Sequence, residues 1–177
     1  MGEASRVSRY LYTVIVLFII WLFLTASIDP QELGFGLLLS LIVAAFTYEI
    51  FTTGGLANLH PKKIIYAAAY IPYFLWAMIV ANLDVAYRVL HPKRPIRPGI
   101  VHCRTVLNTD AGKLALANSI TLTPGTITLD VDDDDYFIHW IWVPDEVLHA
   151  ETEDEHVKNA SSAITVPFEK FLKVIFG

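Results

Sequence analysis

Hydrophobic residues fill long uninterrupted runs in the first half of the chain and alternate with polar residues in the second half. Residues 10–26 form an uncharged apolar run, and residues 33–51 form a second run that is predominantly apolar. Each run is near the length that an α-helix needs to cross a bilayer. We therefore predict a membrane-spanning helical hairpin, with spans at about 10–26 and 33–51.

The charges around this hairpin predict its orientation. The connector "SIDPQE" contains Asp29 and Glu32 but no Lys or Arg, whereas Lys62 and Lys63 follow the second run. Positively charged loops stay in the cytoplasm. Both ends of the hairpin are therefore expected on the cytoplasmic side of the cell membrane, with the connector outside.

Small residues recur along the second run. Gly34, Gly36, Ser40 and Ala44 would let neighbouring helix backbones approach closely in lipid. We predict that these four residues form helix contacts, including contacts beyond the hairpin itself.

A third apolar run, residues 64–90, allows two interpretations. It is long enough to span, but it contains Pro72, Asn82, Asp84 and Arg88 and is rich in aromatic residues typical of the lipid–water interface. Lys and Arg residues also follow it. A span would place these cations outside, whereas an amphipathic helix in the membrane plane keeps every cation inside. We favour the interfacial helix and retain a third span as the alternative.

The second half of the chain predicts a small α+β domain. Three prolines and a glycine in residues 91–99 end the apolar part, so we predict a membrane region at 1–90 and a cytoplasmic domain at 91–177. The patterns predict a strand within 100–108, a helix over 111–120, strands at 126–131 and 136–143, and a helix within 162–176. The order is strand, helix, strand, strand, helix, which favours a small antiparallel sheet with helices on one face.

Finer features of the domain follow from the same patterns. The predicted helix places Leu114, Ala117 and Ile120 on one face. Alternation in the next strand places Ile127, Leu129 and Val131 on one side of the sheet. Pro124-Gly125 is typical of a type II turn, and the run Asp132–Asp135 is expected to form the turn between the last two strands.

Composition and charge support this division. The chain is 54% hydrophobic, with a mean hydropathy of +0.48, which points to a membrane. Residues 1–98 carry eight Lys/Arg and five Asp/Glu, about +3, whereas residues 99–177 carry five and thirteen, about −8. So acidic a domain argues against nucleic-acid binding. The single cysteine, Cys103, excludes an internal disulfide.

The hydroxyl-rich stretch "LANSITLTPGTITLDV" is the strongest candidate for chemistry. No GxSxG motif surrounds Ser119, and nothing in the sequence places a general base beside it. Its glycine follows a helix instead of opening one, so a phosphate cradle is not indicated. Consecutive aspartates lack the spacing of an EF-hand. We expect no catalytic residue, cofactor or metal site. The alternative is a membrane-anchored enzyme or binding domain that uses a loop around Ser119 and Thr121.

Four segments together resemble one family. "RPGIV" at 97–101, "LANSITLTPGTITLDV" at 116–131, "HWIWV" at 139–143 and "FEKFLKVIFG" at 168–177 are similar to the E subunit of the Mrp-type (Mnh, Pha) multisubunit Na+/H+ antiporters. Equivalent subunits occur in archaeal membrane-bound hydrogenases and sulfane reductases that contain an Mrp-like module. The resemblance covers nearly all of the second half, whereas the first half matches in layout only.

The resemblance implies a non-catalytic accessory or assembly subunit. Large partner subunits would carry Na+/H+ translocation, and this chain would bind those subunits and the bilayer. We predict that a loop containing Asn118, Ser119, Thr121, Thr123, Pro124 and Gly125 contacts neighbouring subunits. The host complex, the coupled ion and the role of Asp132–Asp135 stay open at this point.

Overall fold

The computed structural model describes residues 4–51 and 54–176, which form two compact units, Met1–Lys63 and Ile64–Gly177. The third apolar run belongs to the second unit, because it forms a helix that packs on the domain that follows it. The predicted division into a membrane region at 1–90 and a cytoplasmic domain at 91–177 concerns contact with lipid. It therefore stays a prediction.

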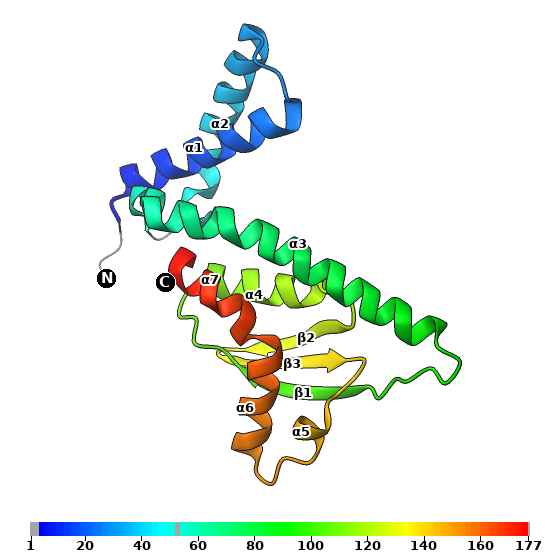
Figure 1. The fold of residues 1–177 in the computed structure, drawn as a ribbon. Coiled ribbons are helices and arrows are strands. Elements are labelled where there is room, and N and C mark those ends of the chain that lie inside the picture. Colours follow the sequence, from blue (N-terminus) through cyan, green and yellow to red (C-terminus); the bar gives the residue numbers. More distant parts are fainter. Residues whose placement is uncertain (1–3, 52–53, 177) are drawn as a thin grey trace. The chain divides into compact units, whose positions relative to one another are not determined.

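The N-terminal unit contains the predicted helical hairpin (Figure 1). Helix α1 (Arg6–Thr25) and helix α2 (Pro30–Phe51) match the two expected spans, and a short 3-10 helix, η1 (Gly55–Leu59), follows. The Ser5 hydroxyl caps the start of α1, and Ala26 ends it in a left-handed conformation. By length and composition, α1, α2 and α3 (Pro61–Leu90) are each apolar enough to cross a membrane.

Small residues of α2 serve the contact with α1. A Cβ atom on Gly36 would lie 2.2 Å from the Trp21 ring, and the indole N–H of Trp21 donates to the Glu32 carbonyl at 3.1 Å. Ser40 and Ala44 are buried on the same side of α2. A Cβ on Gly34, in contrast, would meet nothing within 4 Å. Within the hairpin, Gly36, Ser40 and Ala44 therefore lie at the close contact with α1, whereas Gly34 does not.

The C-terminal unit has the predicted α+β fold. Along the chain it contains α3, β1 (Gly99–Arg104), α4 (Asp110–Leu122), β2 (Thr126–Asp132), β3 (Asp135–Trp140), α5 (Asp145–Leu148), α6 (Glu153–Ile164) and α7 (Val166–Phe176). The expected order of strand, helix, strand, strand, helix is confirmed. Helices α5 and α6 were not predicted, because their polar residues lack a long apolar periodicity.

Three layers build this unit. The sheet is antiparallel, with the strand order β1-β3-β2. Helices α4 and α7 cover one face of the sheet, and α3 lies across them on the side away from the sheet (Figure 1). The core between sheet and helices includes Val101, Leu116, Ile120, Tyr136, Ile138 and Leu172.

Helix α6 covers the outer edge of β1. The backbone N–H of Arg104 donates to the Ser161 hydroxyl at 2.8 Å, and that of His102 reaches the His156 ring at 3.5 Å. An open strand edge invites pairing with other chains. The side chains of α6 satisfy these edge groups, so β1 is protected from such pairing.

One predicted face is wrong, and another is only partly buried. A bulge shifts the register of β2 between Thr128 and Asp130, so Val131 pairs with Tyr136 while Ile127 pairs with His139. A bulge adds one residue to a strand and breaks its alternation, so Ile127, Leu129 and Val131 do not share one side. In α4, Leu114 is 63% exposed, and the buried positions are Gly112, Leu116, Ser119 and Ile120.

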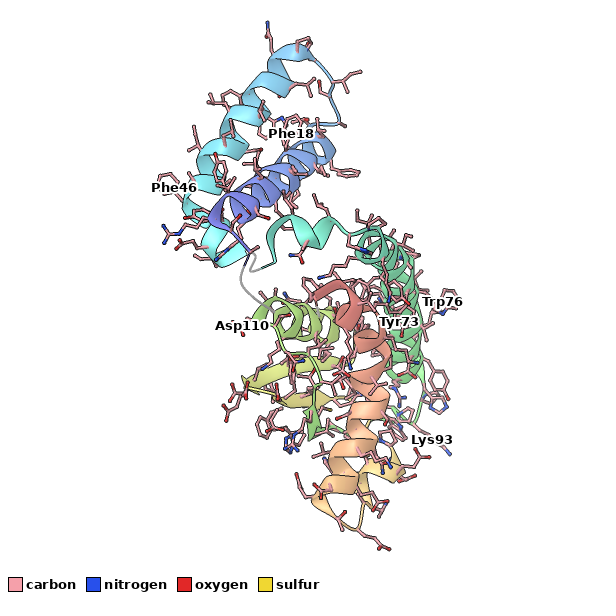
Figure 2. The ribbon with its side chains drawn as sticks, turned by 90° about the vertical axis from the view of Figure 1, so that its left-hand side faces the viewer. Phe18, Phe46, Tyr73, Trp76, Lys93 and Asp110 are labelled. Carbon is pink, nitrogen blue, oxygen red and sulfur yellow. The ribbon has the colours of Figure 1, made fainter. Side chains whose placement is uncertain are left out.

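An aromatic cluster joins α3 to α7. The ring of Phe171 stacks on Tyr73 with the centroids 4.8 Å apart and also contacts Tyr70 and Tyr66. In Figure 2, Tyr73 points from α3 toward the domain, whereas Trp76 points away from it. Helix α3 thus presents one face to the domain and leaves the other face uncovered by it.

Candidate subunit-interface site

The hydroxyl-rich stretch spans the end of α4, a turn and the start of β2. Helix α4 begins at Asp110, where the Thr109 hydroxyl accepts a hydrogen bond from the Gly112 N–H at 3.2 Å. Polar side chains at an N-cap satisfy amides that have no partner within the helix. Since α4 continues to Leu122, Asn118, Ser119 and Thr121 are helical. Only Thr123, Pro124 and Gly125 of the predicted loop lie outside the helix.

The hydroxyl groups of this stretch bond to nearby backbone. Thr123 Oγ1 donates to the Ser119 carbonyl at 2.8 Å, and Thr126 Oγ1 donates to the Ile120 carbonyl at 2.8 Å. The last carbonyls of a helix have no partner within it. The Thr123 and Thr126 hydroxyls donate to such carbonyls and so cap the C-terminal end of α4.

The other hydroxyls fasten β2 to α4. Thr128 Oγ1 donates to the Ala117 carbonyl, and Thr121 Oγ1 accepts from the Thr128 N–H, both at 3.2 Å. The second bond satisfies an amide of β2, which lies at the edge of the sheet. Thr121 therefore has a structural partner, which the sequence pattern alone did not identify.

Ser119 faces the protein interior. It is 5% exposed, and its hydroxyl donates to the Ala115 carbonyl at 2.6 Å. That hydroxyl also hydrogen-bonds to the Tyr70 hydroxyl of α3. Because the Ser119 proton is directed to Ala115, Tyr70 is the donor of the second bond. No His, Asp or Glu of the described residues hydrogen-bonds to Ser119, so no general base activates it.

The turn after α4 has the predicted type II character. Gly125 has a φ of +95°, which suits the third position of such a turn, and the Thr126 N–H donates to the Thr123 carbonyl at 3.3 Å. A Cβ on Gly125 would lie 3.0 Å from Ile141 and 3.4 Å from Val85 of α3. The turn therefore packs within the unit.

The exposed part of this region is one face of α4. Asn118 and Thr121 are exposed, together with Leu114 at 63% and Leu122 at 57%. Leu114, Asn118 and Leu122 follow a spacing of four residues and so share a helix face. Sequence reasoning missed Leu114 as a surface residue because apolar side chains at helical spacing are more often buried.

The acidic run forms the hairpin turn between β2 and β3, with Asp133 at a φ of +50°. The Lys113 ammonium of α4 pairs with Asp133 at 2.7 Å and with Asp134 at 2.8 Å. The hydrogen bonds that the ammonium donates to the two carboxylates raise the pKa of Lys113. The charges of the turn are thus partly balanced by the helix beside it. Among the residues that the structure describes, no group of three or more His, Cys, Asp or Glu could hold a metal ion.

His102 joins two carboxylates on the outer side of β1. Its Nε2 lies 2.8 Å from Asp135 and its Nδ1 lies 3.1 Å from Glu153 of α6. Burial opposes the charge on the ring, but the hydrogen bonds to the two carboxylates outweigh it and raise the pKa of His102. A neutral imidazole carries only one N–H, so both contacts are fully made only when the ring is protonated. Arg104 also binds Asp135, at 2.8 Å.

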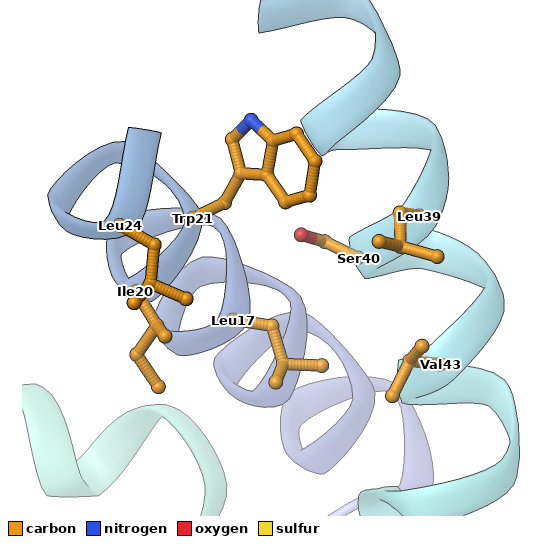
Figure 3. Close-up of a pocket in the computed structure, with 7 residues that line it drawn as sticks. All are labelled: Leu17, Ile20, Trp21, Leu24, Leu39, Ser40 and Val43. Carbon is orange, nitrogen blue, oxygen red and sulfur yellow. The ribbon is translucent and has the colours of Figure 1, made fainter. Parts of the chain in front are cut away.

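The hairpin carries an apolar hollow between α1 and α2 (Figure 3). Its lining is almost entirely hydrophobic, with the Ser40 hydroxyl as one polar group, and consists of Leu17, Ile20, Trp21, Leu24, Leu39, Ser40 and Val43. That hydroxyl donates to the Gly36 carbonyl at 2.7 Å. The hollow therefore lacks the convergent polar groups that orient a substrate.

Comparison with known proteins assigns the chain to a family. Residues 14–164 match the family model MNHE, described as a Na+/H+ ion antiporter subunit. The E subunit of the Na+/H+ antiporter of Bacillus subtilis is 31% identical over 157 residues, which cover 88% of this chain and 90% of that protein. The corresponding E subunit of Alkalihalophilus pseudofirmus is 46% identical over 78 residues, but this match spans only 43% of this chain and about half, 49%, of that relative.

A solved structure extends the comparison. One chain of the membrane-bound sulfane sulfur reductase, an archaeal respiratory membrane complex, is 73% identical and superposes with a TM-score of 0.81. The match covers 96% of this chain and 99% of that chain. The family match over residues 14–164, together with the helical hairpin and the α+β unit, shows that this chain belongs to the MNHE family of Na+/H+ antiporter subunits.

Proposed function

We propose that the chain is an accessory subunit that helps to assemble a multisubunit ion-translocating complex in the cell membrane. The family match carries this proposal, because the relatives that cover most of the chain are antiporter subunits. The 73% identity to a chain of the sulfane sulfur reductase favours a respiratory complex of that kind as the host. A plain Na+/H+ antiporter is the second candidate host, since the curated relatives carry that name.

Partner subunits carry the ion path in this proposal. Ionisable groups inside spanning segments mark the pathways along which proton and sodium transporters move their ions. Within Arg6–Thr25 and Pro30–Phe51, the acidic residues are Glu32 in the first turn of α2 and Glu49 near its end. Neither lies at the centre of a helix, so the hairpin alone offers no relay for a proton or a sodium ion.

The C-terminal unit has no catalytic activity in this proposal. Its strongest candidate nucleophile, Ser119, is buried and bonds to the Ala115 carbonyl and to the Tyr70 hydroxyl. The exposed face of α4 is instead proposed to contact a neighbouring subunit, with Asn118 and Thr121 beside Leu114 and Leu122. This surface is shaped by the buried Ser119 behind it and by the turn that follows α4, which consists of Thr123, Pro124 and Gly125.

The proposed orientation places the C-terminal unit in the cytoplasm. Lys62 and Lys63 follow the hairpin, and the connector between α1 and α2 carries only acidic charges. Protease added to right-side-out cells should leave the C-terminal unit intact, and protease added to inverted vesicles should digest it. Digestion in intact cells would contradict this orientation.

Purification of the tagged chain from its native host tests the function. Extraction in mild detergent followed by mass spectrometry should recover large multi-span subunits together with the chain. Subunits that carry metal clusters would identify a respiratory host, and their absence from the recovered complex would identify a plain antiporter. A chain that elutes alone and monodisperse would overturn the proposal.

A matched pair of variants tests the proposed contact surface. Asn118→Trp places a bulky side chain on the exposed face of α4 and should reduce recovery of the partner subunits. Lys158→Trp makes the same change at an exposed position of α6 and should leave recovery unchanged. Equal recovery from both variants would exclude the α4 face as a contact.

A further inference from the structure

We propose that α3 lies flat in the interfacial layer of the bilayer, with its uncovered face against the lipid and the α+β fold against its other face. The inference rests on the proposed membrane anchoring and cytoplasmic orientation of the chain. It assigns the third apolar helix a lipid-binding surface and a defined depth in the membrane.

Helix α3 has two faces of different surroundings. The residues that contact the domain include Tyr66, Tyr70, Tyr73, Phe74 and Arg88. The opposite face carries a second set at helical spacing, which we call the outer stripe: Ile65, Pro72, Trp76, Ile79, Leu83 and Leu90. Its large side chains are 52–82% exposed.

The outer stripe is continuously apolar. It contains no charged or hydrogen-bonding side chain apart from the indole of Trp76. The polar residues of this part of α3, Asn82 and Asp84, fall on its flanks, and Asp84 is paired with Arg88 at 2.6 Å. A contiguous apolar face of this length marks a surface that another apolar phase covers.

A spanning orientation of α3 conflicts with its contacts to the domain. These contacts run from Tyr66, which meets Phe171, to Arg88, which lies 4.6 Å from the Trp142 ring. At a rise of 1.5 Å per residue this length is roughly 33 Å, about the thickness of the hydrocarbon core. A spanning α3 would therefore draw the domain that lies along it, with its charged residues, into lipid.

The position of α3 in the chain identifies the bilayer as the occupant. Helix α2 is apolar enough to cross a membrane, and only residues 52–60 separate it from α3. A segment of this length reaches at most about 30 Å when fully extended, so the chain itself keeps the start of α3 near the membrane surface. Lipid is therefore always close enough to cover the outer stripe of α3.

Charge supports the same occupant. Lys62 and Lys63 open α3, and Lys93 and Arg94 follow its end. Asp84, already paired, is the one acidic residue in α3, whereas the acidic residues of the domain lie mainly on the β2–β3 turn and in α5 and α6. Cations at both ends of an apolar face, with Trp76 and Tyr87 exposed, suit anionic headgroups and the interfacial layer.

Depth-dependent fluorescence quenching in the intact complex tests the inference. The outer-stripe positions Ile65, Trp76, Ile79 and Leu83 would be changed to Cys one at a time and labelled with the environment-sensitive dye NBD. Burial raises the pKa of Cys103 to about 12, so this thiol stays unreactive and the parent chain serves as the labelling blank. The complex would be reconstituted in phosphatidylcholine vesicles that contain phosphatidylglycerol.

The expected result is a uniform shallow depth. Lipids with a spin label near the headgroup should quench all four positions about twofold more strongly than lipids labelled near the chain end. Ile15→Cys and Ile42→Cys, at the centres of α1 and α2, should show the reverse order as deep controls. Ala81→Cys, on the domain side of α3, should be quenched weakly by both lipids.

Two outcomes would overturn the inference. A depth that increases from residue 65 to the middle of α3 and decreases again would show a third span. The absence of quenching by either lipid would show that a protein partner covers the outer stripe. Partner recovery from the same membranes is scored separately, so loss of partners with shallow quenching would refute the proposed assembly role and leave this inference standing.

Discussion

The Tyr70 hydroxyl of α3 donates a hydrogen bond to the Ser119 hydroxyl of α4, which in turn donates to the Ala115 carbonyl at 2.6 Å. Ser119, which the sequence presents as a possible nucleophile, therefore links α4 to α3 by a hydrogen bond. An activated serine would instead need a base as its acceptor.

Loss of the hydrogen bond between Tyr70 and Ser119 should lower stability without affecting any chemistry. Tyr70→Phe and Ser119→Ala should each reduce the free energy of unfolding by about 1 kcal/mol, because a partly buried hydrogen bond is lost. The double variant should lose little more than either single variant, which gives a coupling of about 1 kcal/mol in a double-mutant cycle. Chemical unfolding of the detergent-solubilised chain, followed by tryptophan fluorescence, measures this.

The exposed neighbour Asn118 supplies the control for the cycle. Asn118→Ala should change the free energy of unfolding by less than about 0.5 kcal/mol. If Ser119→Ala left stability intact but abolished activity of the complex, the structural role assigned to Ser119 would be wrong.

Packing of the hairpin should depend on Gly36 but not on Gly34. Gly36→Ala places a Cβ 2.2 Å from the Trp21 ring, so the helices must separate or the indole must move. Overpacking of this kind costs about 1–3 kcal/mol. Gly34→Ala meets open space and should be neutral or stabilising by up to about 1 kcal/mol, because Ala favours a helix.

Thermal aggregation of the solubilised chain distinguishes these two variants. The midpoint should fall for Gly36→Ala and hold or rise for Gly34→Ala. A smaller side chain at position 21, as in Trp21→Leu, should partly restore Gly36→Ala. Equal midpoints for the two glycine variants would show that the contact is not made.

Phe171 should hold α3 on the domain. Its ring contacts Tyr66, Tyr70 and Tyr73 with centroids 4.8–6.4 Å apart. Phe171→Ala removes these contacts and should cost about 2 kcal/mol, below the value for a fully buried ring because Phe171 is only partly buried. Lys170→Ala changes the exposed neighbour and should have no measurable effect.

Hydrogen exchange provides the readout for this change. Loss of Phe171 should raise amide exchange in α3 more than in β3, which lies on the other side of the core. Uniform exchange across both elements would indicate global unfolding instead of detachment of α3.

His102 should make stability depend on pH. Its pKa is raised in the folded protein, so its contribution is complete below the unfolded value of about 6.5 and is lost as the pH rises through the folded-state pKa. The contacts are partly exposed, with Glu153 at 76%, so solvent screening should limit the effect to less than about 1 kcal/mol.

The matched variant His102→Gln cannot be protonated. Thermal midpoints measured from about pH 6 to about pH 8 should fall more steeply for the parent chain than for this variant. The other histidines contribute equally to both curves, so the difference isolates His102. Parallel curves would show that the contacts with Asp135 and Glu153 carry no stability.

The elements of the fold were more predictable from the sequence than their packing. Uninterrupted apolar runs identified α1 and α2, and the Pro124-Gly125 pair located the turn before β2, since both signals are local. The exposure of Leu114 and the bulge at Leu129 could not be predicted in this way. They depend on which side of an element meets the core, and that is settled by contacts distant along the chain.

The candidate site shows the same limit. The hydroxyl-rich stretch was recognised as unusual, and a turn was expected there. Its partners were not foreseen, because Thr121 meets Thr128 across the start of the sheet and Ser119 meets Tyr70 from a segment 49 residues earlier. The ion pairs of the acidic turn with Lys113 were missed for the same reason.

The fit of Trp21 over Gly36 determines which side chains the hairpin offers to other helices. The hairpin uses Gly36, Ser40 and Ala44 to close on itself, and large side chains such as Phe46 and Ile42 cover its outside. Helices that approach closely need small residues at the contact. A helix of another subunit that packs on this outside therefore meets large side chains, and it should approach the hairpin less closely than α1 approaches α2.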